Sequence, residues 1–296
     1  MSKKFSKPEL SRKINGDIPF DEPKNQKTET NTERLDIALL NFYPYTRGEL
    51  QKFIKLGLVK VNGKVQTIAS TPVTKEDELI LEEPKASTKK PPVIYEDDNV
   101  IIFNKPAGML SMKKGAYLPE TSIDDFGELA HRLDRDTSGV IAVAKNPETK
   151  GFLQKQFQER HAHKIYYAIV EGEPKQSHAI ISVPLARNLK YPTTFIPDPD
   201  GREAITEYKV LESKNGLSLI ELKPKTGRTH QLRIHMNYIG CPILGDKVYN
   251  PKGRKADRMY LHAASLEITI PSKPHNERKI FKADLPNEFN KYFETK

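Results

Sequence analysis

The strand-like runs that begin near residue 93 constrain the fold more than any other feature of this chain. They alternate apolar and polar residues, and several end in a glycine or a polar turn: VIYEDDNVIIFNKPAG, GVIAVAKN, KIYYAIVEG, EAITEYKVLES and LSLIELKPKTG. Helical patterns are sparse, with one over Glu148–His161 and another beginning at His230. A doubly wound fold would alternate strands and helices regularly. The pattern therefore predicts an α+β domain with a mixed, mainly antiparallel sheet flanked by helices.

A proline-rich connector divides the chain. The segment PKASTKKPP, residues 84–92, has the composition of a stiff, exposed spacer, and we expect a linker over residues 85–92. It separates a small unit, residues 31–84, from a larger domain, residues 93–296. Residues 1–30 are rich in lysine, acids, asparagine and proline without a hydrophobic period, which predicts a flexible N-terminal tail.

The small unit has the pattern of two short helices followed by short strands. Two apolar stripes at helical spacing are formed by Leu35, Leu39 and Leu40 and by Leu50, Phe53 and Ile54. Gly57 is expected to close the second helix. The pair Asn62-Gly63 then suits the positive φ angles of a tight hairpin turn.

Basic residues gather on the second helix and dominate the whole sequence. Lys52 and Lys55 fall opposite the apolar stripe, and Arg47 stands at the helix entrance. The chain holds 48 lysines and arginines against 39 acids, a net charge of +9, which favours a polyanionic partner. The helix pattern alone fits a solvated charged face equally well.

Composition excludes several classes of protein. Cys241 is the only cysteine, so neither an intrachain disulfide nor a cysteine-rich metal site is possible. The N-terminal sequence lacks the apolar run of a signal peptide, and no stretch of about 18 apolar residues could span a bilayer. We expect a cytoplasmic protein, and the absence of a strand or helix that is apolar all round favours a monomer.

The densest polar cluster is the segment His131–Gly139, just before a strand-like run. It combines two acids, two arginines and a histidine. If the segment is extended, Arg132, Asp134 and Asp136 share one side while Leu133 points into the core. A turn that uses Asp, Thr and Ser only to satisfy its own backbone is the alternative.

These residues resemble a known signature. The sequence HRLD, residues 131–134, followed by TSG, residues 137–139, is similar to the HRLDxxTSG motif of the RluA family of pseudouridine synthases. Four other stretches match that family in order: NKPAG at 104–108, KIY at 164–166, TGRTHQLRIH at 226–235 and LHA at 261–263. Residues 33–84 resemble the α/β S4 RNA-binding domain. Five ordered motifs and an appended module outweigh the turn-only interpretation.

The resemblance implies an enzyme that isomerises uridine to pseudouridine in structured RNA, in large-subunit rRNA or in tRNA, without cofactor or metal. Asp134 matches the carboxylate that acts at the sugar, and Arg233 matches its ionic partner. Tyr166 matches the tyrosine that packs against the target base. Arg132 matches a residue that enters the space left by the flipped nucleotide, while Asp136 is expected to be structural.

Two alternative functions and a metal site compete with this interpretation. A non-catalytic RNA-binding or ribosome-assembly factor would have lost part of the set Asp134, Tyr166 and Arg233, all of which are present. A nucleoside hydrolase or glycosidase would need Asp136 as a second acid. The four histidines of the motifs are expected to be structural, because His230 and His235 are five residues apart and so do not share a helix face. The segment between residues 109 and 130 is shorter than in the long family members.

Overall fold

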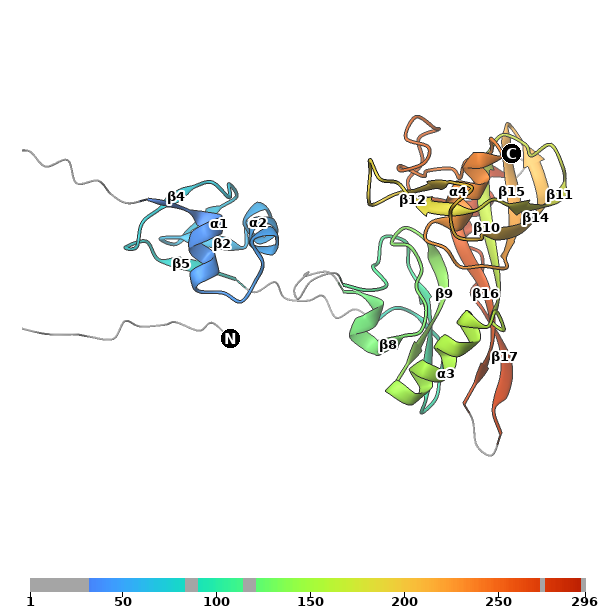
Figure 1. The fold of residues 1–296 in the computed structure, drawn as a ribbon, viewed down its shortest axis with the longest axis horizontal. Helices are drawn as coiled ribbons and strands as arrows, with labels where there is room; N and C mark the ends of the chain where they lie inside the picture. Colours follow the sequence, from blue (N-terminus) through green and yellow to red (C-terminus); the bar gives the residue numbers. More distant parts are fainter. Residues whose placement is uncertain (1–31, 83–89, 114–120, 272–274, 294–296) are drawn as a thin grey trace, which may run out of the picture. The chain divides into compact units, whose positions relative to one another are not determined.

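The computed structural model describes residues 32–82, 90–113, 121–271 and 275–293. They form two compact units, a small one ending at residue 82 and a larger one beginning at residue 90 (Figure 1). The expected tail, residues 1–30, and most of the expected linker lie outside the described residues. No described helix combines the length and the apolar character needed to cross a membrane.

The small unit packs short helices against a three-stranded antiparallel sheet. Its elements are β1 (Glu33–Arg34), α1 (Leu35–Ala38), η1 (Leu39–Asn41), α2 (Arg47–Lys55), β2 (Val59–Val61), β3 (Lys64–Gln66), β4 (Pro72–Val73) and β5 (Leu79–Leu81). The sheet order is β3-β2-β5, and β1 pairs with β4. The expectation for Leu40 was wrong, since its side chain is 41% exposed. The chain tightens into a 3₁₀ turn at Leu39, which changes the helical period and turns Leu40 outward.

Local sequence signals set the boundaries in this unit. Thr46 and Glu49 form a capping box at the start of α2, in which the Thr46 amide donates to the Glu49 carboxylate at 2.8 Å. Asn62 and Gly63 have φ angles of 50° and 76°, and they join β2 to β3 as the sequence predicts. The second apolar stripe, centred on Phe53, is buried as expected.

The larger unit is built on one extended sheet. Its strands are β6 (Val93–Glu96), β7 (Val100–Lys105), β8 (Glu128–Leu129), β9 (Ser138–Ala144), β10 (His163–Glu171), β11 (His178–Ser182), β14 (Ile205–Lys214), β15 (Leu217–Pro224), β16 (Leu261–Ile270) and β17 (Glu277–Lys282). The order is β11-β14-β15-β10-β16-β9-β7-β6, with β17 beside β16 and β8 beside β9. In the described part of the sheet every pair is antiparallel except β16 with β9. This mixed, mainly antiparallel sheet is the predicted fold class.

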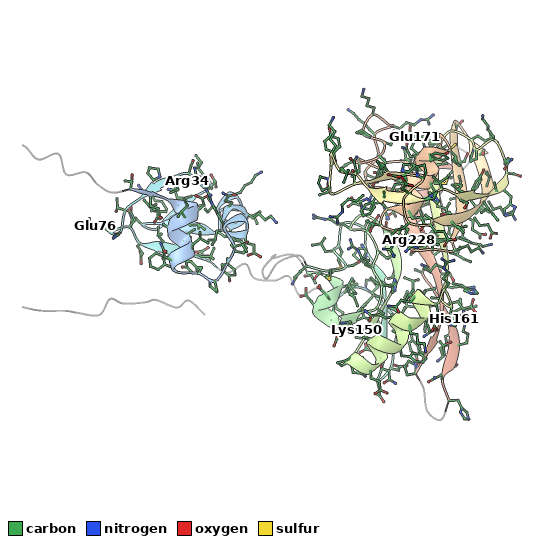
Figure 2. The ribbon with its side chains drawn as sticks, in the orientation of Figure 1. Arg34, Glu76, Lys150, His161, Glu171 and Arg228 are labelled. Atoms are coloured by element: carbon green, nitrogen blue, oxygen red, sulfur yellow. The ribbon has the colours of Figure 1, made fainter. Side chains whose placement is uncertain are left out.

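Few helices accompany the sheet. They are α3 (Pro147–Gln158), α4 (Gln231–Tyr238), η2 (Ile123–Phe126) and η3 (Asn287–Tyr292), and a separate hairpin pairs β12 (Leu185–Arg187) with β13 (Phe195–Pro197). Asn146 caps α3 by accepting the Thr149 amide at 2.8 Å. Lys150 of α3, labelled in Figure 2, donates to Glu128 of β8 at 2.7 Å. Both helices predicted in this domain are present.

The core occupies both faces of the sheet. Leu153 of α3 packs with Ile102 of β7 on one face, while Phe103, the next residue of β7, packs on the other face. Leu232 and Met236 of α4 pack with the buried residues of β10 and β15. Because the β7 and β9 strands are buried on both sides, the loops at their ends stand on a rigid base.

Gly139 explains the single parallel pair. Its φ is 112°, and a Cβ at this position would lie 2.1 Å from the carbonyl oxygen of Ala263 in β16. Only glycine therefore lets β9 approach β16 so closely. The close contact begins five residues after Asp134 and fixes the end of its loop.

Candidate active site

Asp134 lies in the loop between β8 and β9. Leu133 is buried beneath it, and the Asp134 side chain keeps 19% of its surface exposed. The backbone amide of Thr137 donates to the carbonyl of Asp134 at 3.1 Å, so the chain turns directly after Asp134. The expectation of one extended face is therefore wrong for Asp136, which is exposed and does not line the cavity described below. Arg132 is exposed and does line it.

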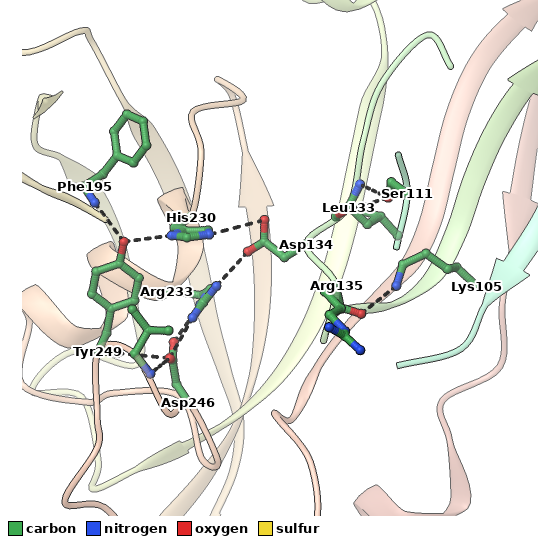
Figure 3. Close-up of polar contacts among 11 residues, drawn as sticks. Lys105, Ser111, Leu133, Asp134, Arg135, Phe195, His230, Arg233, Asp246 and Tyr249 are labelled. Atoms are coloured by element: carbon green, nitrogen blue, oxygen red, sulfur yellow. Dashed lines mark hydrogen bonds and ion pairs between the residues drawn. The ribbon is translucent and has the colours of Figure 1, made fainter. Parts of the chain in front are cut away.

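A second loop, which follows β7, braces the Asp134 loop on both sides. The Ser111 hydroxyl donates to the carbonyl of Leu133 at 2.7 Å and accepts its amide at 3.0 Å. The ammonium group of Lys105 donates to the carbonyls of Pro106, Met109 and Arg135 at 2.7–3.0 Å. Figure 3 shows its contact with Arg135. Lys105 is fully buried. The backbone on either side of Asp134 is thus held by buried hydrogen bonds.

Arg233 of α4 joins Asp134 to a second carboxylate. Its Nη1 lies 3.1 Å from Oδ2 of Asp134, while Nε and Nη2 donate to the two oxygens of Asp246 at 2.7 and 2.8 Å (Figure 3). Asp246 also accepts the backbone amides of Val248 and Tyr249 at 2.9 and 3.1 Å. A bidentate pair of this kind fixes the plane of the guanidinium. One face of the arginine aims at Asp134, as the resemblance implied.

The charges in this cluster stabilise one another. Burial lowers the pKa of Arg233, but hydrogen bonding and the charge of Asp246, together with Asp134, outweigh burial and raise that pKa well above its ordinary value. Burial raises the pKa of Asp246, and the hydrogen bonds and charge of Arg233 reverse this effect, so that the pKa is lowered. Arg233 therefore remains a cation and Asp246 an anion at neutral pH.

His230 completes the surroundings of Asp134. Its Nε2 lies 3.9 Å from Oδ1 of Asp134, and its Nδ1 lies 2.8 Å from the hydroxyl of Tyr249. The Tyr249 hydroxyl also accepts the backbone amide of Phe195 at 3.0 Å, which fixes its position beside His230. Burial lowers the pKa of His230, and the charge of Asp134 only partly offsets this. A neutral imidazole therefore stands next to the carboxylate.

A cavity of about 660 Å³ opens beside Asp134. Tyr166 of β10 and Leu232 and Leu261 contribute apolar surface to its lining. β10 has a bulge between Ile165 and Tyr166 where it pairs with β16, a feature that re-aims side chains. Burial, and to a smaller extent the negative charge of Asp134, raises the pKa of the Tyr166 hydroxyl, which stays protonated. The cavity brings together Asp134, Tyr166, Arg233 and Arg132, four residues selected from the sequence.

Sequence reasoning missed Asp246 and the bracing role of Lys105. Lys105 lay inside a matched motif, but nothing in the sequence indicated which carbonyls it would contact. Each of the four motif histidines has a hydrogen-bond partner: His131 the Ala142 amide, His230 the Tyr249 hydroxyl, His235 the Thr206 hydroxyl and His262 the Ser138 hydroxyl. Within the described ranges no three His, Cys, Asp or Glu side chains are grouped to hold a metal ion.

The cations expected to bind RNA in the small unit have different environments. Lys52 and Lys55 are exposed on α2. Arg47 is held by the fully buried carboxylate of Asp36 at 2.9 Å, which also binds Arg34. Arg47 therefore has a structural partner within the unit, and an RNA contact by any of the three side chains stays a prediction.

Comparison with known proteins identifies the family. The model of the RNA pseudouridylate synthase family matches residues 99–238, and the S4 domain model matches residues 33–79. The chain belongs to the RNA pseudouridine synthases and carries an S4 domain. It is an isomerase of uridine in RNA, as the sequence motifs predicted, and the non-catalytic alternative is not supported.

Several named relatives are similar to this chain. It is 37% identical over 290 residues to the ribosomal large subunit pseudouridine synthase D of Borreliella burgdorferi, and the alignment covers 88% of each of the two chains. It is 38% identical over 205 residues to the dual-specificity RNA pseudouridine synthase RluA of Vibrio cholerae, covering 64% of this chain and 81% of the relative. The solved structure of human RNA pseudouridylate synthase domain containing 1 aligns with a TM-score of 0.55 at 26% identity, over 67% of this chain and 85% of that one.

Proposed function

We propose that this pseudouridine synthase modifies uridine in large-subunit ribosomal RNA, with Asp134 as the carboxylate that acts at the sugar. The similarity to the Borreliella burgdorferi enzyme over most of both chains supports the ribosomal substrate. The similarity to the dual-specificity enzyme makes tRNA the second substrate to test.

The single observation that carries the proposal is the position of Asp134. Its carboxylate lines the cavity with Tyr166, and the buried guanidinium of Arg233 lies 3.1 Å behind it. A cation at this distance compensates the negative charge that either chemical role requires, attack at C1′ or removal of the 2′ proton. The N1–C1′ bond breaks, the uracil turns, C5 bonds to C1′, and N1 gains a proton while C5 loses one.

The remaining side chains hold the base and the strand. Tyr166, as a neutral phenol with a ring on the cavity wall, packs against the uracil and replaces stacking lost on flipping. Arg132, exposed at the cavity edge, enters the space that the nucleotide leaves. Lys52 and Lys55 contact phosphates outside the catalytic domain. All these steps use groups of one chain, so we propose a monomer that requires neither metal nor cofactor.

The proposal is tested by mapping pseudouridine after incubating the purified full chain with large-subunit rRNA and tRNA transcripts. We expect discrete modified sites in the ribosomal RNA, no product with Asp134→Asn, and near-normal product with the matched variant Asp136→Asn. Excess chelator should leave turnover unchanged on RNA that stays folded. Product from a folded Asp134→Asn protein would refute the assigned residue, and modification confined to tRNA would refute the assigned substrate.

A further inference from the structure

Three cations that form no ion pair within the described residues line the same cavity as Asp134. They are Lys164 of β10, Arg202 in the loop before β14, and Arg228 in the loop before α4. Figure 2 shows Arg228 between the parts of the domain that carry α3 and α4. None of the three has a part in the cluster of Asp134, Arg233 and Asp246. Their presence around one cavity needs a separate explanation.

Two glutamates that lie close to Arg202 along the chain are already paired. The carboxylate of Glu203 binds Arg160, and that of Glu207 binds Lys225 at 3.0 Å. Arg228 donates its Nε to the main-chain carbonyl of Glu203 at 2.8 Å. The charge of the Glu203 carboxylate offsets only part of the effect that burial and the neighbouring arginines have on the pKa of Arg228. Among the described residues Arg202 has no ion pair, and Lys164 has only the ring of Phe157, 5.8 Å from its Nζ. The cavity wall therefore carries excess positive charge.

Arg228 and Lys164 are partly removed from water, and Arg202, which is exposed, repels Arg228. Burial, followed by the charges of Arg202 and Arg160, lowers the pKa of Arg228. Burial also lowers the pKa of Lys164. Both shifts mean that the charged forms are disfavoured as the site stands. An anion that bound among these groups would remove that cost.

The backbone holds the group in place before any ligand arrives. Arg202 exchanges two hydrogen bonds with Leu185, at 2.9 and 3.0 Å, so its loop is tied to β12. The Arg228 amide donates at 3.0 Å to the side chain of the buried Gln231. Lys164 is paired with Leu266 inside the sheet. The backbone positions of the three cations are therefore fixed, and only their side chains need to be ordered when an anion binds.

We infer that Lys164, Arg202 and Arg228 form a subsite for one backbone phosphate of the RNA strand beside the nucleotide that enters the cavity. This inference rests on the pseudouridine synthase activity proposed above. A uridine that reaches Asp134 brings its own flanking phosphates to the cavity, and guanidinium groups bind phosphate oxygens in bidentate fashion. Such contacts fix the register of the strand without reading its sequence.

The test pairs protein variants with neutralised phosphates. The probe is a short stem-loop containing a uridine that the wild-type protein modifies, synthesised with single methylphosphonate linkages on either side of that uridine. Arg202→Ala and Arg228→Ala are compared with Arg278→Ala. Arg278 is an exposed arginine of β17 that pairs with Glu267 of β16. Lys164→Met is the third variant. Thermal unfolding shows which variants are folded.

We expect Arg202→Ala and Arg228→Ala each to raise Kd and lower kcat/KM about tenfold and to reduce the salt slope by about 0.7, as for one lost contact on single-stranded RNA. One methylphosphonate position should weaken the wild-type complex at least as much as either substitution does, and it should weaken the Arg202→Ala complex by a smaller factor than the wild-type complex. Arg278→Ala should match the wild type. The subsite would be overturned if Arg202→Ala and Arg228→Ala weakened binding no more than Arg278→Ala does. It would also be overturned if the effect of each substitution on Kd were fully additive with the effect of the methylphosphonate at every position. Absence of any product from the wild-type protein would instead refute the proposed function.

Discussion

Asp246 holds Arg233 on the side opposite Asp134. The two residues share two hydrogen bonds of 2.7 and 2.8 Å, and both side chains are almost completely buried. The contact of Arg233 with Asp134 is single and longer, at 3.1 Å. Asp246 therefore sets the orientation of the arginine, and the arginine presents one remaining donor face to the carboxylate in the cavity.

The first prediction concerns Asp246→Asn. Loss of the charge leaves Arg233 buried with a single weaker anionic partner, so we expect kcat to fall at least tenfold and the free energy of unfolding to fall by about 1–3 kcal/mol. Single-turnover kinetics and urea unfolding measure the two effects. Asp257→Asn is the matched control, because Asp257 is 60% exposed beside Lys291. Unchanged kcat in Asp246→Asn would contradict a positioning role.

The second prediction concerns the brace formed by Lys105. Lys105→Met removes the buried donor shared by three carbonyls, of which, within the described residues, only that of Arg135 keeps another donor, the Gly108 amide at 2.9 Å. We expect a loss of about 2–4 kcal/mol in the free energy of unfolding and a marked fall in kcat. The half-exposed Lys145, which pairs with Glu96, is the control, and Lys145→Met should cost less than about 1 kcal/mol. Ser111→Ala removes the second brace and should lower kcat without changing net charge. Full activity in both loop variants would show that the Asp134 loop needs no support.

The third prediction is a dependence of stability on pH. Burial lowers the pKa of His262 to about 4 and, with the charge of Lys164, that of His131 to about 3, against 6.5 for an ordinary histidine. Between pH 6.5 and these lowered values the unfolded chain binds more protons than the folded protein does. The free energy of unfolding is therefore highest above about pH 6.5 and falls as the pH drops toward 4.

We expect each histidine to contribute about 2–3 kcal/mol of this loss by pH 4, measured by urea unfolding at several pH values. His262→Gln keeps a donor and an acceptor near Ser138 and should flatten the dependence. The exposed His178, changed to glutamine, should leave it unchanged. An equal slope in wild type and His262→Gln would contradict the assignment.

The fourth prediction concerns the S4 domain. Lys52→Glu combined with Lys55→Glu reverses two exposed charges on α2 without touching its buried face. We expect weaker RNA binding and a salt slope lower by about 0.7–0.9 per lost phosphate contact, with little change in turnover at saturating RNA. Lys64→Glu combined with Lys75→Glu makes the same change of net charge away from α2. If both pairs weaken binding equally, α2 has no special role in gripping RNA.

Local sequence determined much of this protein. The capping residues Thr46 and Asn146, the Asn62-Gly63 turn and the alternating strands produced the expected elements, because neighbours along the chain decide them. The motif beginning at His131 identified the reaction through resemblance. Leu40 shows the limit of this reasoning, since a helical period predicted burial and a 3₁₀ turn exposed it.

The tertiary structure alone decided how the site is assembled. Arg233 meets Asp134 across 99 positions in the sequence, and Lys105 meets the carbonyl of Arg135 across 30. Such contacts depend on strand order, above all on the parallel approach of β9 to β16 that Gly139 permits. No local period encodes which distant strands will pair, because that choice is made by packing of the whole core. For the same reason Asp246 and the cations Lys164, Arg202 and Arg228 became visible as partners of one cavity only after the chain was folded.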